Sequence, residues 1–401
     1  MKVTVLFTLI FAILGLEKGE TYNANERYQL LRDKINLSSL HGPLIDDDFF
    51  FSLSFVNSSN LKGLLEEASS LKDEPAAKEF FKNNDQSEKI LGVNIDINAP
   101  LPRFGKVAAS LFLEAQGDYF QGILNTELGC DSISLMIPEG LPTEIKDAFT
   151  CSYFKSLAPG SDLIANMSGI SASLKAAWSG KYYSPSDPTA PNLYLYMEGL
   201  GRLGLNFKYL LRDFFKLKLR FYVSPKSQSS VLLSSGSLSN FDTALFTPQT
   251  KIDLKLDFSS EYEIKNWLFG GTFTNFEVFN LRTISKSQNA GLKSSPLIHF
   301  YGKYFGSFQG IQISHFSGIH LRTLYKAIEG IYLGSEMKFR TFKDRLGLLV
   351  RGRFDKDFYS IGIGIKSLFV DLNVRAHYPL RVKSNGMRPS ALYNFNLRLH
   401  F

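Results

Sequence analysis

The clearest pattern in this chain is an alternation of apolar and polar positions between residues 392 and 401. The apolar positions are Tyr393, Phe395, Leu397, Leu399 and Phe401, and the polar positions between them are Asn394, Asn396, Arg398 and His400. Successive side chains of a strand point to opposite faces, so this segment is predicted to be a strand with one apolar and one polar face. An edge strand this apolar would promote aggregation in water unless another element covered it or the sheet closed on itself. An apolar exterior around a polar lumen is typical of a transmembrane β-barrel.

The same alternation recurs through residues 90–401, which we predict to form the barrel domain. Tilted strands of about ten residues match the thickness of a membrane. Counting the alternating segments predicts an all-β, antiparallel transmembrane barrel of about 12–16 strands, with 14 as the best estimate. A soluble β-sandwich would also alternate, but it would have difficulty holding so many long strands.

Residues 25–89 have a different pattern, which predicts an N-terminal helical region or plug. Tyr28, Leu30, Leu31 and Ile35 follow helical spacing. Residues 60–82 also have helical spacing, interrupted at Pro75, whereas residues 46–56 are extended and rich in Phe. These helices are too short and too charged to span a membrane, so we assign them to the periplasm or to the lumen of the barrel.

Three local predictions depend on turn and helix signals within the barrel region. The pair Gly117 and Asp118 predicts a turn between strands at residues 105–116 and 119–129. Residues 130–162 are predicted to be irregular, with a short helix near residues 144–149. Residues 163–179 are expected to resume the alternation of a strand.

Residues 1–24 are predicted to be a signal peptide, because Lys2 precedes an apolar run of signal-peptide length. The mean hydropathy of −0.06 and the hydrophobic content of 44% exclude a helical membrane bundle. They do not exclude a barrel, whose strands are only half apolar. The aromatic content of 14% suits the aromatic girdles of such a barrel.

The formal charge of +7 is scattered rather than gathered into a basic patch, which argues against a nucleic-acid partner. Lipid of the outer membrane and a small hydrophobic or anionic solute are the expected partners; the oligomeric state is left open. Cys130 and Cys151 are the only cysteines. In an exported protein this pair predicts a disulfide, with two separate buried thiols as the alternative.

Other motifs favour structural explanations. Gly199, Gly201 and Gly204 match G-x-G-x-x-G, but no acidic residue follows at the expected distance, so relief of crowding in a curved strand explains them better than a dinucleotide. No His or Cys has metal-ligand spacing, and no cofactor or metal is predicted. Asp371 with His377 leaves a barrel hydrolase as a minor alternative, although polarity of the lumen explains these residues better.

Polar residues on the inward faces of the last strands are the candidate binding site. They are Asp371, Asn373, Arg375, His377, Asn396 and Arg398. Lumen positions of a barrel are polar for structural reasons alone, so contact with a solute or plug is the functional reading of the same pattern.

Three passages resemble the long-chain fatty-acid transporter superfamily, most closely its conjugal-transfer TraF-like branch: residues 266–280, 345–376 and 393–401. The resemblance implies a barrel of about fourteen strands with an N-terminal segment in its lumen. The expected function is uptake or passage of a small solute, with no enzyme activity, across the outer membrane of a Gram-negative envelope. The alternative is a structural or assembly barrel of a secretion or conjugation apparatus.

Overall fold

The computed structural model covers the whole chain of 401 residues. The structure describes residues 24–37, 49–69, 76, 79–80, 83–84, 87–124, 141–157, 162, 164–179, 192–212, 214–234, 249–283, 295–308, 311–323, 325–341, 346–380 and 388–401. Residues 1–23 of the predicted signal peptide at residues 1–24 lie outside the described residues, as does Cys130, so the signal peptide and the disulfide between Cys130 and Cys151 stay predictions.

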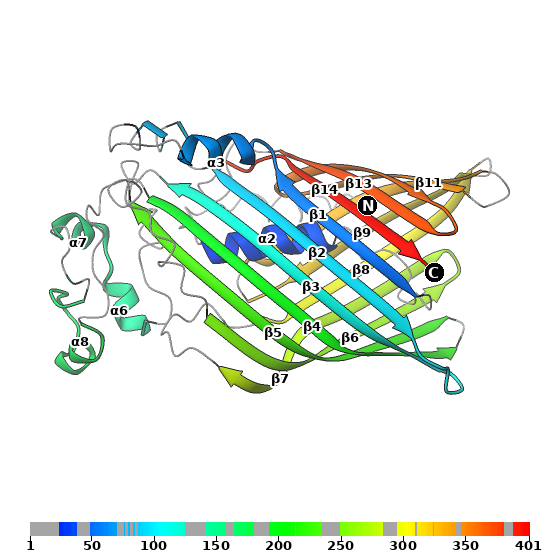
Figure 1. Cartoon of the computed structure of the whole chain (residues 1–401), viewed down its shortest axis with the longest axis horizontal. Coiled ribbons are helices and arrows are strands. Elements are labelled where there is room, and N and C mark those ends of the chain that lie inside the picture. The colour runs from blue at the N-terminus through cyan, green and yellow to red at the C-terminus, as the bar shows by residue number, and fades with distance from the viewer. Residues whose placement is uncertain are drawn as a thin grey trace, which may run out of the picture.

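The described strands form one closed antiparallel barrel of 14 strands, which confirms the all-β antiparallel barrel and the best estimate of strand number. Each strand pairs with its neighbours in sequence, and β1 pairs with β14 to close the ring (Figure 1). The strands are β1 Phe50–Ser58, β2 Glu88–Pro100, β3 Val107–Leu124, β4 Asn192–Arg212, β5 Phe215–Ser234, β6 Gln249–Ile264, β7 Trp267–Thr283, β8 Leu297–Phe308, β9 Ile311–Leu321, β10 Ile331–Thr341, β11 Leu346–Asp355, β12 Phe358–Lys366, β13 Val370–Pro379 and β14 Leu392–His400.

The closing seam joins the two ends of the barrel sheet. Phe55 of β1 lies opposite Phe395 of β14, and Leu53 opposite Leu397, so apolar side chains meet across the seam on the outer face. The last strand therefore closes the barrel as its alternation predicted. The partner of this last strand is β1. The sequence assigned this segment to the N-terminal region and started the barrel at residue 90, whereas in the structure the barrel begins at Phe50.

The two faces of the wall differ in polarity. On β5 the side chains of Leu219 and Phe221 point outward and are 38% and 42% exposed. Arg220 and Tyr222, which alternate with them along the strand, point inward, where both contact Asp257 of β6. Exposed Leu, Ile, Val and Phe side chains continue around the outer surface on other strands, including Val93, Ile95, Leu111, Leu113, Leu203, Leu205, Phe207, Ile361, Ile363, Val374 and Phe395.

The barrel has two unlike ends. At the end that we call the turn end, Phe401 donates its backbone N–H to Phe49 O at 3.0 Å, and a tight turn at Ser367 joins β12 to β13. At the other end, which we call the loop end, β1 ends and β2 and β14 begin. The helices α6 Thr143–Ala148, α7 Cys151–Ser156 and α8 Ala172–Trp178 lie beyond the loop end (Figure 1).

These helices have a small apolar core of their own, separate from the barrel. It contains Leu141, Ile145, Phe149, Leu157, Ile164 and Met167. The short helix predicted near residues 144–149 is confirmed as α6. In the part of the chain that the structure describes, no helix is both long enough and apolar enough to cross a membrane.

Two sequence predictions were wrong. Residues 105–129 do not turn at Gly117, because β3 runs unbroken from Val107 to Leu124 and Asp118 points into the lumen. The segment at residues 163–179 contains helix α8 rather than a strand. Ser171 caps this helix by accepting a hydrogen bond from the Leu174 N–H, and Ala, Leu and Lys then favour helix, so local signals outweigh the alternation.

Candidate functional site: the lumen of the barrel

Helix α2, Ala24–Leu37, lies in the region predicted to be helical and is inside the barrel (Figure 1). Residues 27–35 are all buried, on every side of the helix. An amphipathic helix at a surface leaves its polar face in water, so burial all round means that the strands surround this helix. The lumen and α2 together therefore form the candidate site.

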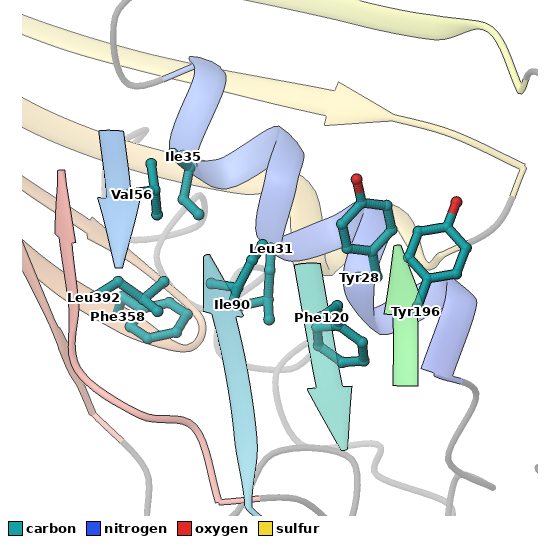
Figure 2. Close-up of a cluster of buried hydrophobic side chains, with 9 residues drawn as sticks. All are labelled: Tyr28, Leu31, Ile35, Val56, Ile90, Phe120, Tyr196, Phe358 and Leu392. Atoms are coloured by element: carbon teal, nitrogen blue, oxygen red, sulfur yellow. The ribbon is translucent and has the colours of Figure 1, made fainter. Parts of the chain in front are cut away.

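One face of α2 is apolar and packs against the loop-end half of the wall. Tyr28, Leu31 and Ile35 project from successive turns of the helix. They join a buried cluster with side chains from β1, β2, β3, β4, β12 and β14, namely Val56, Ile90, Phe120, Tyr196, Phe358 and Leu392 (Figure 2). Because six strands contribute, no short segment of the chain could reveal this contact.

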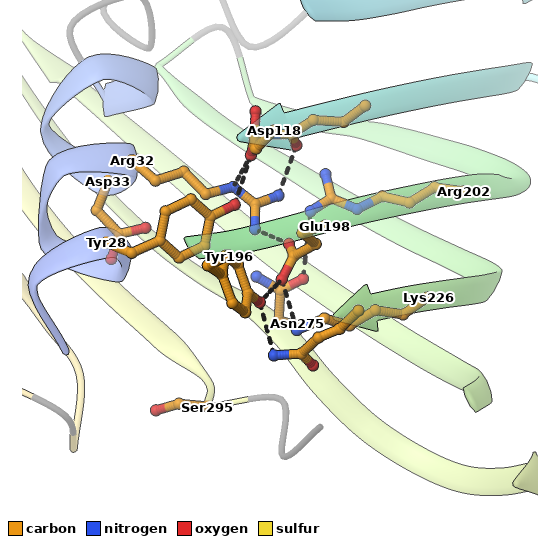
Figure 3. Close-up of polar contacts among 12 residues, drawn as sticks. Tyr28, Arg32, Asp33, Asp118, Tyr196, Glu198, Arg202, Lys226, Asn275 and Ser295 are labelled. Atoms are coloured by element: carbon orange, nitrogen blue, oxygen red, sulfur yellow. Dashed lines mark hydrogen bonds and ion pairs between the residues drawn. The ribbon is translucent and has the colours of Figure 1, made fainter. Parts of the chain in front are cut away.

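A second face of α2 is held by carboxylates on β3 and β4. The Arg32 guanidinium forms an ion pair with Glu198 and lies 3.5 Å from Asp118, and the Tyr28 hydroxyl donates to Asp118 at 2.6 Å (Figure 3). Glu198 in turn accepts from Lys226 of β5 at 2.8 Å. Each charge at this contact is buried, and each has an opposite partner.

A third face of α2 meets the turn between β11 and β12. Arg27 contacts Glu88 at 2.8 Å and Asp357 at 2.9 Å. Lys34 contacts the same Asp357 at 2.6 Å and Asp355 at 3.0 Å. Asp357 is therefore shared by two cations of the helix, Arg27 and Lys34, which are about two turns apart.

Asp33 fastens α2 to the segment after β9. Its carboxylate accepts from Arg322 at 2.9 Å and from the Tyr325 hydroxyl at 2.9 Å. Burial alone would raise the pKa of Asp33, but the charge and hydrogen bond of Arg322 outweigh it and hold the pKa below its ordinary value. The carboxylate is thus anionic when the helix is docked.

The depressed pKa of Asp33 predicts that α2 is released more easily in acid. A group whose pKa is lower in the docked state stabilises that state above its undocked pKa, near pH 4, and loses the contribution as the pH falls further. Hydrogen exchange of residues 24–37 measured from pH 7 to pH 3 should show loss of protection in this range. Asp33→Asn should remove part of the pH dependence; an unchanged profile would contradict the assignment.

The rest of the described lumen is crowded with paired charges. Glu114 of β3 accepts from Arg202 of β4 at 2.7 Å and also pairs with Arg220 of β5. Two small cavities, of about 20 and 30 Å³, lie beside α2 and near Lys208. Each has room for a water molecule but not for an organic solute. No group of metal-binding side chains occurs among the described residues.

The six predicted lumen residues fall into two groups on the last strands. Asp371 lies opposite Arg398, and Asn373 opposite Asn396, across the β13–β14 pair. Asp371 accepts from His400 at 3.1 Å, and Arg398 lies 4.3 Å above the Phe50 ring. His377 contacts Ser360 of β12 at 2.6 Å, and Arg375 lies opposite Gly362. In the described contacts, α2 touches none of the six.

Sequence reasoning missed the residues that hold α2. Its partners Glu88, Asp118, Glu198, Arg322 and Asp357 are spread along most of the chain, and the contacts join residues up to 330 positions apart. The available signal was within the helix: three cations, Arg27, Arg32 and Lys34, and two anions, Glu26 and Asp33, beside an apolar face. Buried charges need partners, so such a helix in a lumen implies complementary charges on the wall.

The G-x-G-x-x-G match lies within β4 and has a packing role at Gly204. A Cβ there would come within 2.1 Å of the Phe221 carbonyl oxygen on the neighbouring strand. Gly201 is also close to Pro225, whereas Gly199 has open space. Because the motif lies inside a strand, it lacks the strand-to-helix turn that a dinucleotide site requires.

Neither a protein-family model nor a curated protein matches the chain in sequence. Among solved structures, the chain is similar to the TodX deltaS2S3 mutant monoaromatic hydrocarbon channel, with 9% identity, a TM-score of 0.39 and 92% of each chain covered. It is similar to CdiB from Acinetobacter baumannii, with 8% identity, a TM-score of 0.33, and coverage of 89% of this chain and 60% of that one. A mutant Rh. blastica porin has 8% identity and a TM-score of 0.30, with 88% and 99% covered. The resemblance to the fatty-acid transporter superfamily stays a prediction.

Proposed function

We propose that this protein is an outer-membrane barrel of a Gram-negative envelope that passes a small solute, with α2 as the plug that closes its lumen at rest. The observation that carries the proposal is the enclosed helix: α2 is held to the wall by buried ion pairs and hydrogen bonds as well as by an apolar face. When the helix leaves, water can solvate the charged groups on both sides, which offsets part of the cost of breaking these pairs. On this proposal residues 1–24 are a signal peptide and the chain is not an enzyme.

The outer face of the barrel supports insertion in lipid. Closure leaves no sheet edge, and the outward side chains are apolar on strand after strand. Aromatic side chains gather near the turn end, where Trp267 lies 5.0 Å from Tyr304 and Phe214 lies 5.7 Å from Tyr262, measured between ring centroids. Aromatic girdles at the lipid–water boundary have this composition. The turn end, which carries Phe401, would face the periplasm.

Substitution of outward residues tests insertion directly. Leu219→Arg places a charge on the proposed lipid face and should lower the free energy of unfolding in bilayers by about 2–4 kcal/mol if Leu219 is near the midplane. Lys218→Arg is the matched control, because it puts the same residue on the lumen face one position away. Heat-modifiable migration of detergent-extracted protein reports folding. Equal stability of the two variants, or a wild type soluble without detergent, would refute the lipid face.

Planar-bilayer recording of the protein with and without α2 tests passage. Current that appears only when α2 is removed supports a plugged channel.

A specific observation favours a second function, an anchoring barrel of an envelope apparatus: α6, α7 and α8 form a separate unit with its own apolar core beyond the loop end. Absence of current in every variant, with co-purification of envelope proteins that requires residues 141–179, would favour that function.

A further inference from the structure

Three neighbouring strands place arginines on both sides of a row of very small residues in the lumen wall. On β12, Ser360 lies between Arg353 of β11 and His377 of β13. Two residues further along the same strand, Gly362 lies between Arg351 and Arg375. Because every second residue shares a face, these six side-chain positions form one surface. We call it the arginine grid.

The position of the Arg375 side chain requires a glycine at residue 362. A Cβ at Gly362 would lie 2.9 Å from Arg375 Cγ, closer than side-chain carbons normally approach. Absence of a side chain at Gly362 therefore lets Arg375 lie across β12. The outer two strands are about 10 Å apart, so arginine side chains from β11 and β13 can reach toward one another over this strand.

Among the contacts of the described residues, cations outnumber anions around the grid. Glu336 is the carboxylate that accepts from Arg351, at 2.6 Å, and it also pairs with Lys303 and, at 3.6 Å, with Lys338. One anion thus serves three cations. Asp355 lies 3.5 Å from Arg353 and is shared with Lys34 of α2. The strongest charges acting on Arg375 are two cations, Arg351 and Arg353, and one anion, Glu336.

Two buried side chains in the grid have an atom without a hydrogen-bond partner among the described residues. Arg353 is 2% exposed and its Nε has no acceptor, while His377 is 4% exposed and its Nε2 is unpartnered. In the tautomer in which the Ser360 hydroxyl donates to His377 Nδ1, the ring proton lies on Nε2, which is then a second unused donor. Unused buried donors are costly, and an oxyanion would satisfy both.

We propose that the arginine grid is a binding site for an oxyanion group, such as the carboxylate or phosphate of a solute, bound by Arg353, Arg375 and His377 over Gly362. Arginine suits this role because its planar fork matches two oxygens of such a group. The site deepens the proposed function, and rests on it for access through the lumen. It adjoins the plug, since Arg353 also donates to the Lys34 carbonyl oxygen of α2 at 3.0 Å.

Binding is tested with inorganic phosphate and with octanoate on detergent-folded protein, at constant ionic strength set with chloride. The unfolding temperature is followed in the full chain and in a variant lacking residues 24–37. We expect a saturable rise with at least one probe. A rise with phosphate alone identifies a free anion, and a rise with octanoate alone identifies the head of an amphiphile. No saturable rise with either probe, in either protein, overturns the site.

Three variants locate the bound anion. Arg375→Gln should weaken apparent binding about tenfold to a hundredfold, as expected for loss of a charged hydrogen bond. Gly362→Ala keeps every charge but displaces Arg375, and should also weaken binding. Lys218→Gln, which removes a lumen cation of β5 outside the grid, should bind as wild type. Equal weakening by Lys218→Gln would show general charge attraction and overturn the site. Binding without bilayer current would leave the site standing while refuting passage.

Discussion

Deleting residues 24–37 should convert a closed barrel into a conducting one. The full chain should show no sustained current in a planar bilayer. On the proposed function α2 closes the lumen, where it contacts β2, β3, β4 and the end of β11. Without it, a 14-strand barrel retains a polar interior of intermediate width, between the filled 8-strand barrels and the open 16-strand porins. Stepwise current that scales with salt concentration is the expected record.

The control for this deletion is Arg398→Gln. Arg398 is a lumen cation that lies over the Phe50 ring on the turn-end side, away from the described contacts of α2. This variant should fold, migrate in a heat-modifiable manner and remain closed. A deletion variant that folds equally well but stays closed would show that the wall itself blocks passage.

Asp357→Asn should detach α2 while leaving the barrel intact. The substitution preserves size but removes the one carboxylate shared by Arg27 and Lys34, at a site that is fully buried. Breaking a buried ion pair by removing one partner costs about 3–5 kcal/mol. The population of undocked helix should therefore rise by about two orders of magnitude or more. Hydrogen exchange and limited proteolysis of residues 24–37 measure this change.

Asp371→Asn is the matched control, since it removes another lumen carboxylate by the same chemistry. Asp371 pairs with His400 and Lys366 rather than with α2. Protection of residues 24–37 should remain at the wild-type level in this variant. If both variants, or neither, released the helix, docking would not depend on the shared contact at Asp357.

The sequence alone determined the barrel and most of its strands. Alternation within about ten residues is a local property, so the strand predicted at residues 392–401 could be located closely, as β14 confirms. The predictions failed where two local signals competed. Gly117 and Asp118 have the composition of a turn, but pairing with β2 and β4 on both sides keeps that strand straight.

The strand Phe50–Ser58 shows what only the closed sheet decided. Its Phe-rich pattern predicted an extended segment, but nothing local indicated that it would lie beside β14, at the opposite end of the chain. Partner choice in a barrel is a property of the whole ring, because each strand needs two neighbours and only closure supplies the last pair.

The lumen site shows the same division between sequence and tertiary structure. The sequence determined which residues of β13 and β14 face inward, since that follows from a period of two. It also predicted a helix at residues 25–36 with an apolar face and five charged residues. Only the tertiary structure decided that Arg27 meets Asp357, that Arg32 meets Glu198, and that Gly362 lies between two arginines. The physical reason is that charge pairing and crowding depend on distance in space, which alternation along one strand does not encode.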